Sequence, residues 1–151
     1  MRKITAIIFL NLTLSSCFLF SKFKRTNFTY SEGAHSYFIP ILVPKGYIKE
    51  RTEVDSSGNT ILSYSYSSKA SYYVAYLVDT ATQLQSIIEE DNIPRVAMAT
   101  GAFIYKGMDA DMLYWREIRK DNLRVGYRSV PRELESRFDS ATNYVAVRPL
   151  K

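Results

Sequence analysis

The chain of 151 residues contains one thiol, that of Cys17, and one imidazole, that of His35. A nucleophile of the Ser-His or Cys-His type could be built only around His35, and the adjacency of Ser36 in sequence gives no catalytic geometry. Zinc needs three or four nitrogen or sulfur ligands, which this chain does not supply. We therefore assign no catalytic residue, no metal site and no cofactor.

Carboxylates offer a second kind of chemistry. Glu117, Glu133 and Glu135 could pair for acid–base catalysis, although ion pairing and helix charge are the commoner roles of such residues. A calcium loop beginning at Asp109 would need a glutamate at its twelfth position, where the chain has Lys120. A β-turn is therefore expected around Asp109.

The segment Tyr114–Arg128 mixes aromatic side chains with arginines, the residue types that dominate binding hot spots. On a strand Arg116 would point to one face and Trp115 and Glu117 to the other, so at least one aromatic side chain must enter the core. Two interpretations stay open: a partner-binding surface, or core aromatics beside solvated arginines. The residues proposed for partner binding are Trp115, Arg116, Arg124, Tyr127 and Arg128.

The N-terminus has the layout of a secretory signal. A positive head, Arg2-Lys3, is followed by the mostly apolar stretch Ile4–Leu14 and by two small residues before Cys17. This stretch is too short to span a bilayer, which needs about 20 apolar residues. Leu14-Ser15-Ser16-Cys17 resembles the lipobox of bacterial lipoproteins, in which a leucine and two small residues precede the cysteine that becomes the first mature residue.

The resemblance covers only about the first twenty residues. It implies attachment of diacylglycerol to the Cys17 sulfur, cleavage after Ser16, and usually acylation of the new amine. Two or three acyl chains are enough to anchor a protein stably to a membrane. The implied parts are a signal peptide at 1–16 and a lipidated cysteine with a tether at 17–29. The domain would then be held on a membrane of the bacterial cell envelope, outside the cytoplasm.

The alternative is an uncleaved anchor helix over Ile4–Phe20, because Phe18-Leu19-Phe20 continue the apolar run. Basic residues flank that run on both sides, so the positive-inside rule assigns no orientation. A disulfide is not expected, since the chain has no second cysteine.

Length, composition and net charge limit the kind of domain that this chain can form. The length suits one domain, and 46% apolar with 23% charged residues is ordinary for a globular protein. Removal of Arg2 and Lys3 with the signal would lower the formal net charge from +5 to +3, and there is no long basic run. We therefore expect no nucleic-acid partner. The twelve tyrosines favour a domain rich in strands.

Alternation predicts most of the strands. Stretches 47–54 and 60–66 flank the turn residues 55–59 and form a hairpin. Residues 72–78 are apolar on both faces, which is typical of a strand inside a sheet. The remaining predicted strands lie at 37–43, 102–105, 112–119 and 123–129.

Helical spacing predicts two helices. The first follows Thr80 or Thr82 and ends before Pro94, and the second begins at Pro131. The apolar stripe of the second consists of Leu134, Phe138, Ala141 and Val145. The expected fold is α+β, a single globular domain over 30–151. An antiparallel sheet of about six strands in two meanders would carry two helices on one face.

Two classes of function follow. The first is a membrane-anchored bacterial envelope lipoprotein with a small non-catalytic binding domain, whose partner would be an envelope protein, a glycan or an anionic lipid. An immunity or protective lipoprotein belongs to the same class. The second is a carboxylate-dependent envelope hydrolase, which would need two acidic side chains in one concave pocket.

Overall fold

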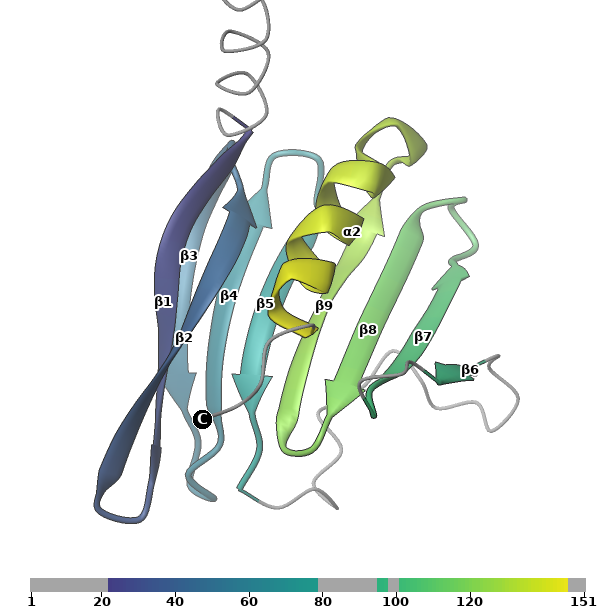
Figure 1. The fold of residues 1–151 in the computed structure, drawn as a ribbon. Coiled ribbons are helices and arrows are strands. Elements are labelled where there is room, and N and C mark those ends of the chain that lie inside the picture. The colour runs from purple at the N-terminus through teal and green to yellow at the C-terminus, as the bar shows by residue number, and fades with distance from the viewer. Residues whose placement is uncertain (1–21, 79–94, 98–100, 147–151) are drawn as a thin grey trace, which may run out of the picture.

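The computed structural model describes residues 22–78, 95–97 and 101–146. Within these ranges the chain forms nine β-strands and the helix α2 (Figure 1). A hairpin pairs β1 (Phe23–Glu32) with β2 (His35–Pro44), and a seven-stranded sheet has the order β3-β4-β5-β9-β8-β7-β6, with antiparallel pairing throughout. The other elements are β3 (Tyr47–Val54), β4 (Thr60–Tyr66), β5 (Ser71–Tyr76), β6 (Arg95–Ala97), β7 (Phe103–Met108), β8 (Tyr114–Lys120), β9 (Leu123–Val130) and α2 (Arg132–Ala146).

The hairpin β1-β2 and the helix α2 lie side by side over one face of the seven-stranded sheet (Figure 1). We call this side of the sheet the helix face and the opposite side the second face. The core lies between the two layers. Phe28 and Ile41 of the hairpin, Tyr72 and Val125 of the sheet and Phe138 of the helix are almost fully buried there. The fold is α+β, as predicted.

Local sequence explains the β3–β4 hairpin, which is confirmed. Alternate residues of β4 from Thr60 to Tyr66 are buried, as expected of a strand with one face on the core. In the turn, Asp55 Oδ1 accepts hydrogen bonds from the backbone N–H groups of Ser57 and Asn59 at 2.9 and 3.0 Å. Gly58 takes a φ of 85°, which only glycine adopts without strain.

The C-terminal helix is also confirmed. It begins directly after Pro131, and its first turn carries Glu133 and Glu135 at the positive end of the helix dipole. Phe138 and Val145 are each 1% exposed on the stripe that faces the sheet. The other predicted helix, which starts at Thr80 or Thr82, lies outside the described residues.

The N-terminal part of the domain differs from the prediction. The tether predicted for 17–29 overlaps β1, which pairs with β2 over ten residues from Phe23 to Glu32. Phe28 is 1% exposed, whereas Lys24 and Arg25 point outward. A strand with a basic outer face and few core residues has the composition of a linker, which explains the error. The sheet itself has seven strands rather than about six.

Candidate functional site

A buried carboxylate lies on the second face of the sheet. Glu117 of β8 is 2% exposed. The hydroxyl of Tyr73, on β5, donates to Glu117 Oε2 at 2.6 Å, and Arg119 Nε donates to Oε1 at 2.5 Å. Both carboxylate oxygens therefore have a donor, and the charge of Glu117 is balanced where it is buried.

Gly126 of β9 makes room for this contact. Tyr73, Gly126 and Glu117 form one cross-strand row, so the tyrosine ring must cross β9 to reach the carboxylate. A Cβ at Gly126 would lie 2.6 Å from the Tyr73 hydroxyl oxygen and 2.5 Å from the backbone oxygen of Arg116. Because Gly126 has no side chain, the Tyr73 ring can lie across β9 at this position.

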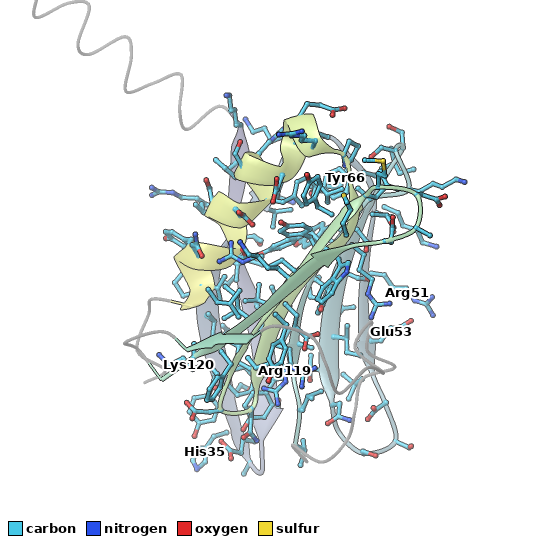
Figure 2. The ribbon with its side chains drawn as sticks, turned by 90° about the vertical axis from the view of Figure 1, so that its right-hand side faces the viewer. His35, Arg51, Glu53, Tyr66, Arg119 and Lys120 are labelled. Carbon is cyan, nitrogen blue, oxygen red and sulfur yellow. The ribbon has the colours of Figure 1, made fainter. Side chains whose placement is uncertain are left out.

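Two further arginines on the second face, Arg124 and Arg128 of β9, lie near Arg119, Glu117 and Tyr73. Arg119 and Arg124 are direct cross-strand partners, and the Arg119 guanidinium also lies 4.4 Å from the centroid of the Tyr105 ring. Arg124 Nη1 donates to the backbone oxygens of Asp121, in the β8–β9 turn, and of Leu123, the first residue of β9. Figure 2 shows Arg119 in the lower half of the sheet. We call Arg119, Arg124 and Arg128 the arginine cluster.

Burial favours the neutral form of two titratable side chains at this site, Arg124 and Tyr73. Burial, and then the positive charge of Arg119, lower the pKa of Arg124. Burial, and then the negative charge of Glu117, raise the pKa of Tyr73 well above its ordinary value. Tyr73 is thus a hydrogen-bond donor at neutral pH rather than a base. An anion beside Arg119 and Arg124 would relieve the repulsion between like charges on adjacent strands.

Two of the five residues proposed for partner binding face the helix instead. Arg116 is 6% exposed, and its Nη1 lies 2.7 Å from Asp139 Oδ1 while its Nη2 donates to Asn143 Oδ1 at 2.8 Å. Tyr127 is 1% exposed and donates to Asp139 Oδ1 at 2.8 Å. These contacts attach α2 to the sheet, so Arg116 and Tyr127 are not on the surface that carries Arg124 and Arg128.

Trp115 lies near the start of β8 and is 8% exposed. Its ring covers Gly107 of β7, where an added Cβ would come within 2.7 Å of the indole. A depression of about 280 Å³ opens beside it at the end of the sheet. Its lining consists of Lys106, Gly107, Met108, Tyr114, Trp115 and Glu135.

The remaining predicted residues are dispersed. Glu117 belongs to the second face, whereas Glu133 and Glu135 belong to α2 on the helix face, so these three carboxylates do not converge. His35 is exposed at the start of β2, at the lower end in Figure 2. Cys17 lies outside the described residues.

The turn at Asp109 behaves as predicted. Asp109 Oδ1 accepts hydrogen bonds from the backbone N–H groups of Asp111 and Leu113 at 3.0 and 2.9 Å. This carboxylate therefore shapes the β7–β8 turn. Among the described residues no group of three or more His, Cys, Asp or Glu side chains is placed to hold a metal ion.

Sequence reasoning missed Tyr73, Tyr105 and Arg119 as members of the site. The available signal was Gly126, a glycine in the interior of a predicted strand, which can indicate that another group approaches the backbone closely. The residue that approaches is far away in sequence, and it can be identified only once the pairing of β5 with β9 is known.

Comparisons with protein-family models, with curated proteins and with solved structures find no match to this chain. Over residues 22–78, 95–97 and 101–146, no helix combines the length and the apolar character that a bilayer span requires.

Proposed function

We propose that this protein is a lipid-anchored lipoprotein of the bacterial cell envelope whose domain binds an anionic partner and catalyses no reaction. The anchor is supported by Leu14-Ser15-Ser16-Cys17, which follows an apolar stretch and contains the only cysteine of the chain. Acylation at this position would keep the domain on its membrane, because each buried methylene contributes about 0.8 kcal/mol.

Metabolic labelling with a palmitate analogue tests the anchor. The wild type should incorporate the label and Cys17→Ser should not, since the thioether needs the sulfur. Ser16→Ala keeps a small residue before the cysteine and should be labelled like the wild type. Labelling that survives in Cys17→Ser would rule out acylation at this residue.

The binding role is carried by the arginine cluster. The second face carries three arginines beside one buried carboxylate, Glu117, which pairs with Arg119. Arginine suits bidentate contact with carboxylate or phosphate groups. The partner classes that match this chemistry are an acidic envelope protein, an acidic glycan and an anionic lipid headgroup.

The same geometry supports binding rather than acid–base catalysis. Both oxygens of Glu117 are engaged, and Tyr73 holds its proton because burial and the neighbouring carboxylate raise its pKa. A general acid or base needs an oxygen within hydrogen-bond reach of the reacting proton. Both oxygens of Glu117 instead accept hydrogen bonds from Tyr73 and Arg119.

A polyanion titration tests the binding role. The probe is polygalacturonate, a carboxylated glycan, and dextran sulfate serves as a second polyanion. The full chain with Arg124→Ala and Arg128→Ala should bind the probe at least about tenfold more weakly than the wild type, which corresponds to about 1.4 kcal/mol. Lys45→Ala with Arg132→Ala removes the same charge from exposed positions outside the second face, in the β2–β3 connection and in α2, and should change binding little.

Circular dichroism on the same proteins separates binding from folding. Substitutions at exposed positions usually change stability by less than about 0.5 kcal/mol, so the control variant should unfold like the wild type. The Arg124/Arg128 variant loses the hydrogen bonds of Arg124 to the turn and should be somewhat less stable, but it should remain folded. Equal affinity of the wild type and the Arg124/Arg128 variant would contradict the proposal. Unfolding of that variant alone would assign the two arginines a structural role.

A further inference from the structure

The position at which the chain enters β1 is fixed by the helix. The backbone oxygen of Lys22 accepts hydrogen bonds from Lys45 N at 2.9 Å, from Arg137 Nη2 at 2.7 Å and from Arg137 Nε at 3.1 Å. Arg137 Nη2 also donates to the backbone oxygen of Lys45 at 2.8 Å. Three donors on one carbonyl hold the N-terminal end of β1 beside α2 and the β2–β3 connection.

The backbones of three lysines and the guanidinium of Arg137 lie at or beside this position. Lys22, Lys45 and Arg137 are brought together by the contacts to the Lys22 carbonyl. Lys69 lies in the adjoining β4–β5 turn, where its N–H donates to the backbone oxygen of Tyr66, and the Tyr66 hydroxyl in turn donates to the oxygen of Pro44 at 2.6 Å. We call Lys22, Lys45, Lys69 and Arg137 the basic end.

Acidic residues share this end of the sheet with the basic end, but none is paired with its lysines within the described ranges. The three lysine side chains are exposed and make no ion pair within the described ranges. Glu50, on the adjacent strand β3, is already paired with Lys24 at 3.6 Å. The other acidic residues at this end of the sheet are Glu133 and Glu135 on α2, with Glu135 lining the depression beside Trp115, and Asp109 and Asp111 in the β7–β8 turn.

The distance from the basic end to the acylated residue is bounded by covalent geometry. Five peptide links separate Cys17 from Lys22, and a chain reaches at most about 3.6 Å per residue, or about 18 Å in total. The opposite end of the sheet is further away by the length of β4, whose seven residues correspond to about 23 Å. The basic end is therefore the part of the domain that the tether keeps nearest the bilayer, and charges held more than about 8 Å from the surface are largely screened at physiological salt.

We propose that the basic end contacts anionic lipid headgroups and thereby orients the domain upright on its membrane, an inference whose geometry rests on the proposed lipid anchor. Each lysine or arginine near an anionic leaflet raises the partition coefficient of a protein onto that membrane about fivefold. The second face, with its arginine cluster, would then stand perpendicular to the bilayer and remain accessible to a partner.

Vesicle partitioning in a Cys17→Ser background tests the basic end independently of acylation. Lys45→Gln with Lys69→Gln should weaken partitioning of this full chain onto vesicles rich in phosphatidylglycerol about thirtyfold, the equivalent of about 1 kcal/mol for each lysine. The effect should shrink as salt is raised. Phosphatidylcholine vesicles measure the contribution of the apolar N-terminal residues alone, and both proteins should bind these vesicles equally.

The matched control is Arg51→Gln with Lys120→Gln, which removes the same charge. Lys120 is the last residue of β8, at the opposite end of the sheet, and Arg51 lies in the second half of β3. This variant should keep its preference for phosphatidylglycerol to within about threefold, since its charges lie beyond the screening length from the surface. Equal losses in the two double variants would overturn the proposal, because the attraction would then follow net charge and not the basic end.

Energy transfer in the acylated wild type tests the orientation. Trp115 is the only tryptophan, and the pairing of Tyr114 with Val130 places the start of β8 at the same end of the sheet as the basic end. Transfer from Trp115 to a dansyl-labelled headgroup should be stronger in phosphatidylglycerol than in phosphatidylcholine vesicles, and Lys45→Gln with Lys69→Gln should remove the difference. Equal transfer in both lipids would overturn the upright orientation.

The anchor and the basic end can fail separately. If palmitate labelling fails, the anchor is wrong, and the Cys17→Ser partitioning still decides whether the basic end binds anionic lipid.

Discussion

Arg116 and Asp139 form an ion pair between the sheet and the helix, with Arg116 Nη1 2.7 Å from Asp139 Oδ1. The arginine side chain is 7% exposed and the aspartate 36%. Tyr127 donates to the same Asp139 oxygen, so one carboxylate of α2 joins two strands of the sheet. An arginine that the sequence presents as a surface residue is therefore part of the contact between the two layers.

Arg116→Ala should destabilise the domain by about 2 to 3 kcal/mol, because it leaves the half-buried Asp139 with one partner fewer and empties a buried site. Chemical denaturation followed by circular dichroism measures the loss. Arg132→Ala, which removes an exposed arginine from the first position of α2, should change stability by less than about 0.5 kcal/mol. Similar stability of both variants and the wild type would show that the Arg116 pair contributes nothing to docking of the helix.

Gly126→Ala should disturb the candidate site directly. The new methyl group would lie 2.5 Å from the backbone oxygen of Arg116, which belongs to the neighbouring strand and cannot move independently. Overpacking of this kind costs about 1 to 3 kcal/mol. The thermal midpoint should fall, and the Tyr73 ring should leave Glu117.

Ser63→Ala provides the control for Gly126→Ala, because Ser63 lies in the same cross-strand row on β4. It adds no atom in the path of Tyr73 and should leave the midpoint nearly unchanged. A Gly126→Ala protein with wild-type stability would mean that the β8–β9 pairing accommodates a side chain at this row.

Tyrosine ionisation should be coupled to unfolding at alkaline pH. Burial raises the pKa of Tyr64, Tyr66, Tyr72 and Tyr127 above the ordinary value of 10.0. Because the folded pKa values are the higher ones, the stability they contribute is fully present below pH 10.0 and is lost as the pH rises above it. Phenolate absorbance should therefore appear in two steps, exposed tyrosines first and buried ones together with the loss of circular dichroism. A single titration of all twelve tyrosines with the fold intact would contradict the burial of these side chains.

The elements that were predictable from sequence have local signals. The β3–β4 hairpin has alternation on both sides of a turn whose Asp55 and Gly58 carry specific backbone chemistry. The α2 helix has Pro131 before it and a repeated apolar stripe that includes Phe138. In each case the residues that determine the structure lie within one turn or one strand of each other.

The elements that were not predictable depend on distant residues. β1 has only a few core side chains, such as Phe28, and its partner β2 is what makes it a strand. The candidate site joins Tyr73 to Glu117 across 44 positions, and this follows from the order of strands in the sheet and not from any spacing in the sequence. Alternation did indicate that Trp115 and Arg116 face opposite sides, but not which side holds the helix.

Phe138 is the central contact of α2 with the sheet. Its ring is 1% exposed and meets Tyr66 at a centroid distance of 5.1 Å and an angle of 67°, and Tyr127 at 5.6 Å and 64°. Such edge-to-face pairs add about 0.5 to 1.5 kcal/mol beyond the area that they bury. The ring therefore contributes both apolar burial and oriented aromatic contacts to the packing of the helix.

Phe138→Ala should lower the free energy of unfolding by about 3 to 5 kcal/mol, a large part of the roughly 5 to 15 kcal/mol that stabilises a domain of this kind. If the variant does not fold, Phe138→Leu keeps most of the volume and should cost less, about 1 to 2 kcal/mol, so that a measurable transition remains. Ser140→Ala, at an exposed position of the same helix, controls for helix propensity. Denaturant unfolding of the three variants gives the comparison. An unchanged midpoint for Phe138→Ala would mean that α2 does not pack on the sheet through this residue, and the contact of Arg116 with Asp139 would then have to account for the position of the helix.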